Sequence, residues 1–317
     1  MTRFGYFLSS EEFTPNELLD QARMAEEAGF EALWISDHFH PWTDEQGESP
    51  FVWSVIGALS QVCRLPVTTA VTCPTVRTHP AVIAQAVATS ALLHAGRFVL
   101  GVGSGEALNE LVVGGTWPLT DERLEMLEEA VELMRKLWTG DVVTVRGRHY
   151  TVEHARIYSL PDEPPAVYIS GFGPTSIELA GRIADGYIST MPDSDAVKQF
   201  RESGGGDKPA QGGLKVCWST DAAEARRTVH RIWPNSGLPG ELSQVLRTPE
   251  HFMQASSIVT EAQATEGTPC GNDVDEHVSA VQAYVDAGFD EVYINQIGPD
   301  QKGFFDFYRD EVLPRLR

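Results

Sequence analysis

An aspartate, two histidines and a tryptophan lie close together in the sequence, just after an apolar run near the start of the chain. The run covers 32–35, and the side chains are those of Asp37, His38, His40 and Trp42. A carboxylate and an imidazole in one desolvated pocket can act as general acid and base, because burial and mutual charge tune their proton affinities. At the end of a parallel strand they lie where α/β folds bind ligands. The alternative is a surface loop whose indole covers the core.

Two further carboxylates follow predicted strands in the same way. Glu11 comes after a strand predicted over 4–8, and Glu106 comes after a strand predicted over 98–102. In a barrel of parallel strands both would face the rim that carries the acid–imidazole pair. The alternative for Glu106 is a carboxylate that begins a helix and is stabilised by the backbone amides there.

Two glycine-rich turns also follow predicted strands. They are Gly103-Ser104-Gly105 and Gly171-Phe172-Gly173. Small residues let backbone amides approach an anion, so the pair suggests a flat aromatic ligand with a phosphate-bearing arm. The first turn lacks both the third glycine of the dinucleotide fingerprint and the lysine of a P-loop. Ordinary tight turns between strand and helix are the alternative, and Arg77 is either a counter-charge or an exposed arginine.

Strands and helices alternate along the whole chain, which predicts an α/β fold of the (β/α)8 TIM barrel type. The clearest helix start is Thr14, followed by Pro15 and Glu17 as a capping box. Strands are expected at 4–8, 32–35, 67–72, 98–102, 167–170, 187–189, 215–218 and 292–297. Helices are expected at 15–28, 51–62, 80–93, 121–138, 175–184, from about 221, at 274–287 and at 304–316.

Three stretches interrupt this alternation, and we expect a single domain over 1–317 with insertions near them. The first, 141–160, contains alternating residues that predict a β-hairpin. The second, 191–213, is rich in Gly, Asp and Pro and is typical of a mobile loop. The third, 233–272, has no clear periodicity.

Composition excludes several classes of partner. A formal charge of −21 argues against nucleic acid and anionic membranes, which attract basic surfaces. No apolar stretch is long enough to span a bilayer, and no signal sequence is evident. Four well-separated cysteines show no metal-like spacing and predict reduced thiols. We therefore expect a cytoplasmic protein that acts on a small molecule and holds no metal.

Three segments resemble a known family. They are 36–42, 80–86 and 101–110, and they resemble the luciferase-like superfamily. The resemblance is closer to the branch that uses the deazaflavin coenzyme F420, which includes glucose-6-phosphate dehydrogenases. It covers nearly the whole chain and weakens between Met191 and Asn272. It implies a bacterial luciferase-like barrel, F420 as cofactor and a homodimer.

The resemblance also implies roles for single residues. His38 would accept the proton, Glu106 would be the second acid–base group, and Trp42 and Glu11 would line the substrate pocket. A non-proline cis peptide at the end of the third strand would support the deazaflavin ring. The predicted cofactor-binding set is Asp37, Ala70, Val71, Thr72, Cys73, Gly105, Asn109, Gly171, Phe172 and Gly173.

The chain departs from the sugar-phosphate pattern of that branch. The threonine matching Thr190 is followed there, three residues later, by a lysine that helps to bind phosphate, whereas this chain has Asp193. The later basic residues of the pattern fall in a stretch that carries Glu261 and Glu266. We therefore expect hydride transfer between F420 and an alcohol or sugar, or the matching carbonyl, with glucose 6-phosphate a poor substrate.

Two other functions compete with this one. An FMN-dependent monooxygenase of the same superfamily would need oxygen and a reductase partner. A barrel that binds a ligand without turnover belongs to another class, and the intact Asp37, His38 and Glu106 argue against it.

Overall fold

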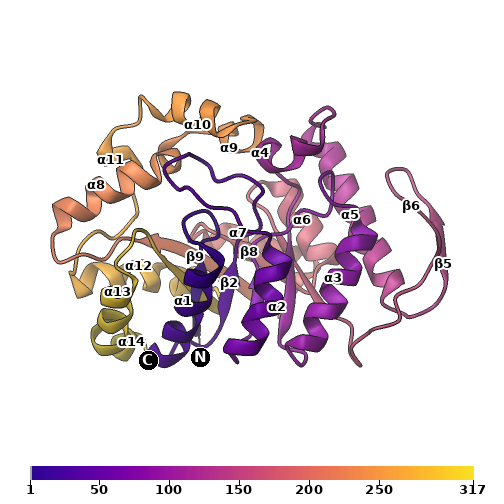
Figure 1. Ribbon diagram of the computed structural model, residues 1–317, viewed down its shortest axis with the longest axis horizontal. Coiled ribbons are helices and arrows are strands. Elements are labelled where there is room, and N and C mark those ends of the chain that lie inside the picture. The colour runs from indigo at the N-terminus through magenta and orange to yellow at the C-terminus, as the bar shows by residue number, and fades with distance from the viewer. Residues whose placement is uncertain (1) are drawn as a thin grey trace.

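Eight parallel strands close into a barrel in the computed structural model, which describes residues 2–317 (Figure 1). The chain's first and last barrel strands pair with each other, which confirms the expected (β/α)8 architecture. In chain order the barrel strands are β1 (Arg3–Leu8), β2 (Leu33–Ile35), β3 (Val67–Thr69), β4 (Phe98–Val102), β7 (Ala166–Ser170), β8 (Gly186–Ser189), β9 (Ala210–Val216) and β10 (Glu291–Gln296).

Helices surround the barrel (Figure 1). The expected capping box at Thr14 and Glu17 is present at the start of the first helix. The outer helices are α1 (Pro15–Ala28), α2 (Val52–Val62), α3 (Pro80–Leu93), α5 (Thr120–Leu137), α6 (Pro174–Ile183), α7 (Ser194–Phe200), α8 (Ala222–Ile232), α12 (Val274–Asp286), α13 (Gln301–Phe307) and α14 (Leu313–Leu316). Four short helices are α4 (Ala107–Glu110), α9 (Leu242–Val245), α10 (Pro249–Ser256) and α11 (Glu261–Ala264).

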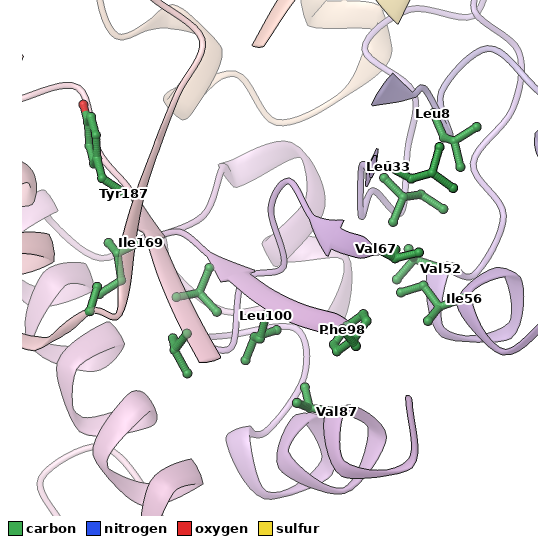
Figure 2. Packing of buried hydrophobic residues seen from close by; sticks show 14 of the residues in the cluster. Leu8, Leu33, Val52, Ile56, Val67, Val87, Phe98, Leu100, Ile169 and Tyr187 are labelled. Carbon is green, nitrogen blue, oxygen red and sulfur yellow. The ribbon is translucent and has the colours of Figure 1, made fainter. Parts of the chain in front are cut away.

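The main core lies between the strands and the helices. Val67 and Phe98 on the strands belong to one buried cluster with Val52 and Ile56 on α2 and Val87 on α3 (Figure 2). Full burial of one such side chain stabilises the fold by about 1.5–3 kcal/mol. This packed layer fixes the positions of the strands, and the strands in turn fix the positions of the side chains at their ends.

The inside of the barrel is filled by aromatic side chains. The rings of Trp34 and Tyr293 stack with centroids 4.4 Å apart, and Phe7 packs edge-on against Trp34. A Cβ atom on Gly213 would lie 2.2 Å from the Trp34 ring, so only glycine fits there. The barrel is therefore no channel, and chemistry is confined to its rim.

Two barrel strands differ from their predictions, and one of them is β3, which ends at Thr69 where a strand over 67–72 was expected. The expected strand at 215–218 is observed as β9 at 210–216, and the expected mobile loop at 191–213 contains α7 and most of β9. The loop assignment was wrong because it read Gly212 and Gly213 as loop residues. A Cβ on Gly212 would lie 2.5 Å from Tyr284, so these glycines accommodate aromatic rings pressed on the strand.

The other two irregular stretches pack on the barrel in different ways. The predicted hairpin is present as β5 (Val143–Arg146) and β6 (Thr151–Ala155), an antiparallel pair outside the barrel. The segment that contains α9, α10 and α11 lies over the carboxyl-terminal ends of the strands (Figure 1). Phe252 of this segment shares a buried cluster with Trp42 and Trp233. It is a cover for the barrel mouth.

Candidate active site

The imidazole of His38 lies between two carboxylates at the mouth of the barrel. Its Nε2 atom is 3.4 Å from Glu11 Oε1 and 3.8 Å from Glu106 Oε2. Glu11 follows β1, His38 follows β2, and Glu106 follows β4, so three strand ends deliver the cluster. The structure thus brings together the acid–base residues expected from the sequence.

Asn109 fixes the orientation of this imidazole. Its Oδ1 accepts hydrogen bonds from the backbone N–H groups of Phe39 and His40, so its Nδ2 must be the donor on the other side. That Nδ2 lies 3.0 Å from His38 Nδ1 and 3.1 Å from Glu106 Oε2. His38 Nδ1 also lies 3.2 Å from the backbone oxygen of His40, so two neighbours hold this edge of the ring, and Nε2 faces the two carboxylates.

The two carboxylates have opposite proton affinities. Burial raises the pKa of Glu11, but the charge of His38 and the hydroxyls of Ser36 and Ser9 outweigh it, so that pKa is lowered overall. Burial raises the pKa of Glu106, and His38 and Asn109 only partly oppose it. Glu106 is therefore the stronger base of the pair.

Trp42 forms one wall of the site. Its ring is buried, with its centroid 5.0 Å from that of His38 and tilted by 58°. Its other neighbour is Phe252 of the covering segment, whose ring centroid is 5.1 Å away. Trp42 therefore joins the acid–base cluster to the cover.

Asp37 faces a second, buried ion cluster beside the first. Its Oδ2 accepts a hydrogen bond from Thr72 at 2.8 Å, and its Oδ1 pairs with Arg77 at 2.7 Å. Arg77 also lies 3.8 Å from Glu110, which is fully buried and accepts hydrogen bonds from the Val76 and Arg77 backbone. The expectation of an exposed arginine is wrong, and Arg77 is the counter-charge of two buried carboxylates of the protein itself.

The loop after β3 has the form expected from the resemblance. The Ala70–Val71 peptide is cis, and Thr72 bridges to Val102 of β4. Cys73 follows, and burial raises the pKa of its thiol well above the usual range. Gly105 faces this loop with a φ of +92°, and a Cβ there would lie 2.9 Å from Glu110. The residues predicted to support a flat ring therefore lie together at one side of the mouth.

The second glycine-rich turn lies at the end of β7 and makes no hydrogen bond with His38 within residues 2–317. Gly171 packs on Ser176, and Gly173 precedes the first turn of α6, whose N-terminus suits a phosphate. A cavity of about 430 Å³ opens here. It is lined by Phe172, Tyr187, Ser189, Met191, Pro192, Asp193, Ser194 and Ala196. A concave space at the ends of β7 and β8 fits a cofactor with an extended arm.

Sequence reasoning missed two residues of the mouth, Lys215 and Glu12. Lys215 is the inward-facing residue near the end of β9, with its Nζ atom 4.2 Å from the centroid of the Trp233 ring. Glu12 accepts hydrogen bonds from Trp233 Nε1 and from the Gly298 backbone. The only signal for Glu12 was its place beside Glu11. Lys215 was hidden because the strand was predicted to begin there.

Replacing Glu12 by Gln is expected to change how stability depends on pH. Burial raises the pKa of Glu12 to about 7 from an ordinary 4.5. A raised pKa in the folded state stabilises the protein at low pH, and this contribution is lost as the pH rises through about 7. Between about pH 5 and pH 8 the wild type should therefore lose roughly 1–3 kcal/mol of unfolding free energy relative to Glu12→Gln. Urea unfolding measures it, with exposed Glu163→Gln as control, and parallel wild-type and Glu12→Gln curves would contradict it.

No group of His, Cys, Asp and Glu side chains within residues 2–317 is arranged to hold a metal ion. No helix in the same range has the length and apolar character needed to cross a membrane.

Comparison with known proteins places this geometry in a family. Residues 1–291 match the family model described as luciferase-like monooxygenase, and the chain belongs to that family. It is 38% identical to an F420-dependent glucose-6-phosphate dehydrogenase of Microbacterium testaceum, covering 99% of this chain and 97% of the relative. A second such dehydrogenase, of Nakamurella multipartita, is also 38% identical, with 99% and 96% covered.

Solved structures agree with these relatives. An F420-dependent secondary alcohol dehydrogenase, in complex with an F420-acetone adduct, superposes with a TM-score of 0.91 at 30% identity. The match covers 100% of this chain and 99% of that chain. An F420-dependent tetrahydromethanopterin reductase of Methanopyrus kandleri superposes with a TM-score of 0.76 at 20% identity, which shows the shared fold.

Proposed function

We propose that this chain oxidises an unphosphorylated alcohol or sugar, or reduces the matching carbonyl, at the cluster of His38, Glu11 and Glu106. The chain is an F420-dependent oxidoreductase, as are its curated relatives and the alcohol dehydrogenase it superposes on. When bound, F420 supplies or accepts the hydride. The observation that carries the proposal is the imidazole held between two carboxylates at the mouth.

The hydrogen-bond network supports a division of roles between His38 and Glu106. His38 Nε2 is the ring nitrogen that faces the two carboxylates at the mouth, and in this proposal it donates a hydrogen bond to the oxygen of the substrate. Glu106, with its raised pKa, takes the hydroxyl proton during oxidation and returns one during reduction. This assignment reverses the sequence-based expectation that His38 is the acceptor. Trp42 excludes water from one side of the cluster.

The cofactor residues proposed are those on the β3, β4 and β7 sides of the mouth. Asp37 anchors the loop after β3 through Thr72 and Arg77, and each carboxylate oxygen keeps a free lone pair for a further donor. The cis Ala70–Val71 peptide, Cys73 and Gly105 would lie behind the ring, with Asn109 beside it. Phe172, which lines the cavity, and the flanking Gly171 and Gly173 at the start of α6 would hold the arm.

Charge at the mouth supports the preference for unphosphorylated substrates. Asp193 lines the cavity beside β8 and caps α7, so it places a carboxylate where the related pattern has a lysine. Glu261 lies 3.8 Å from Arg226 on the surface, and that arginine is therefore already paired. A dianionic phosphate would meet carboxylates on this side.

The experiment that tests the proposal is a substrate screen with F420. Purified protein is expected to reduce F420 with neutral secondary alcohols or sugars and to turn over glucose 6-phosphate at least 10-fold less efficiently, since one misplaced charge costs more than about 1.4 kcal/mol. Loss of the absorbance of oxidised F420 measures it. Equal efficiency with glucose 6-phosphate and glucose would contradict the preference. Tryptophan fluorescence with F420 and with FMN tests cofactor choice, and binding of FMN alone would support the monooxygenase.

We also propose that the protein is a homodimer formed through α2 and α3. This face exposes Phe51, Val82 and Leu93, whose exposed fractions are 68%, 56% and 46%. An apolar groove of about 350 Å³ lies among them, which suits burial against a second copy. The four cysteines are free thiols, which is compatible with the proposed cytoplasmic location.

Placing a charge in this groove is expected to separate the dimer. Val82→Glu should shift the protein from dimer to monomer in sedimentation at micromolar concentration, because a buried unpaired carboxylate costs several kcal/mol. Val142→Glu is the matched control, since Val142 is 59% exposed on the hairpin side. A dimer that survives Val82→Glu unchanged would place the interface elsewhere.

A further inference from the structure

Lys215 points into the barrel at the level of the mouth. Two residues earlier, Gly213 faces the Trp34 ring inside the barrel, and two before that, Gln211 accepts a hydrogen bond from Trp34 Nε1 at 2.8 Å. Alternate residues of a strand share one face, so Lys215 continues this inward row. It is the last inward residue of β9 and therefore borders the space above the aromatic filling.

The ammonium group of Lys215 has no acceptor of its own. Within residues 2–317 it makes no hydrogen bond and no ion pair, and its neighbour is the face of the Trp233 ring. Burial lowers the pKa of Lys215, while the charges of Glu11, Glu12 and Glu106 oppose that shift. The side chain of Lys215 is partly exposed at the mouth, and its ammonium group has three donors that a ring face does not satisfy by hydrogen bonding, so they are open to an oxygen that enters the mouth.

The surrounding charges decide what kind of oxygen can satisfy these donors. Three carboxylates act on the one ammonium group, those of Glu11, Glu12 and Glu106. An anionic oxygen brought to Lys215 would be repelled by this excess of negative charge. A hydroxyl or carbonyl oxygen carries no such penalty, and a hydroxyl can also donate to a nearby carboxylate such as Glu12.

Lys215 and His38 lie on different sides of the mouth. Between β2, which leads to His38, and β9, which carries Lys215, stand β1 and β10. Neighbouring strands are about 4.8 Å apart, so a ligand that touches both groups must carry oxygens separated by several bonds. One oxygen would be on the reacting carbon and the other remote from it.

We propose that Lys215 is a specificity-determining residue that binds a remote, uncharged oxygen of the substrate, so that the enzyme selects diols and polyols over simple alcohols. This inference rests on the proposed function, because it assumes that an alcohol reacts at the His38 cluster. It adds the chemical class of the substrate and the residue that recognises it.

A matched series of secondary alcohols tests the selection. Butan-2-ol and hexan-2-ol have one hydroxyl, butane-1,3-diol and hexane-1,5-diol add a remote hydroxyl, and 3-hydroxybutyrate and 5-hydroxyhexanoate replace it with a carboxylate. We expect the wild type to prefer one diol over its mono-alcohol by about 10- to 100-fold in kcat/KM, the usual worth of a hydrogen bond to a charged group. The hydroxy acids should be the poorest.

Lys215→Met keeps the unbranched side chain as far as the ε position and removes the ammonium group. We expect the ratio of kcat/KM for diol over mono-alcohol to fall by about 10- to 100-fold in this variant, because a lost charged hydrogen bond affects only the diol. Because the result is a ratio within one variant, a general loss of activity cancels. The ratio should be unchanged in Lys136→Met, a variant at an exposed position on α5.

Three results would overturn the proposal. One is an unaltered ratio in Lys215→Met, and another is a wild type that does not distinguish diols from mono-alcohols at either chain length. A wild-type preference for the hydroxy acids that Lys215→Met removes would make Lys215 an anion site. In all three cases the wild type still reduces F420, so the proposed function stands. A wild type inactive with every alcohol would overturn both proposals.

Discussion

Glu106→Gln is expected to lower kcat for alcohol oxidation by about 100- to 10,000-fold, the usual contribution of a positioned general base. The amide of Gln still offers an oxygen to Asn109 Nδ2, which now bonds Glu106 at 3.1 Å, so the position of His38 is preserved. It cannot take the hydroxyl proton. Stopped-flow reduction of F420 measures the loss, and Glu163→Gln, an exposed change away from the mouth, is the control.

The pH profile of the same reaction gives a second readout. Burial raises the pKa of Glu106 above its ordinary 4.5. Oxidation needs the ionised carboxylate, so kcat should fall as the pH decreases through that raised pKa, and Glu106→Gln should lack this acidic limb. A variant that retains both the rate and the acidic limb would move the acceptor role back to His38 or to Glu11.

Arg77→Met is expected to cost about 3–5 kcal/mol of unfolding free energy, because it leaves buried carboxylates without their cation. The side chains of Arg77, Asp37 and Glu110 are 13%, 4% and 1% exposed, so water cannot replace the lost charge. Urea unfolding of the purified variant at neutral pH measures the change.

An exposed pair provides the matched control for that prediction. Arg146 pairs with Glu153 on the hairpin, with side chains 76% and 55% exposed, and Arg146→Met should cost at most about 1 kcal/mol. Adding Glu110→Gln to Arg77→Met should restore part of the stability, since one uncompensated charge is removed. Equal losses for Arg77→Met and Arg146→Met would show that the buried cluster is not what stabilises the mouth.

The sequence was informative where local patterns coincide with the fold. The capping box at Thr14 and Glu17 set the start of α1, and each apolar run that ended in titratable residues marked a rim position. Since the carboxyl ends of parallel strands share one rim, the meeting of Glu11, His38 and Glu106 followed from strand order alone.

The residues that escaped prediction depend on contacts distant in the chain. Gly212 and Gly213 are strand residues because rings of α12 and β2 press on them, and no local pattern distinguishes this from a loop. Arg77 is buried because it pairs with Asp37, which follows β2, and with Glu110, which follows β4. The position of Lys215 at the mouth follows from the register of β9 with β10, and no local sequence pattern gives this register.

The aromatic filling of the barrel leaves molecules a single entrance and exit. The stacked rings of Trp34 and Tyr293 block the interior, so substrate and product enter and leave through the mouth of the barrel. The segment that contains α9, α10 and α11 lies over this mouth. Its Phe252 packs against Trp42, and Trp233, which precedes the segment, donates a hydrogen bond to Glu12. This segment therefore borders the path of substrate and product, and the hydrogen bond from Trp233 to Glu12 ties its start to the loop after β1.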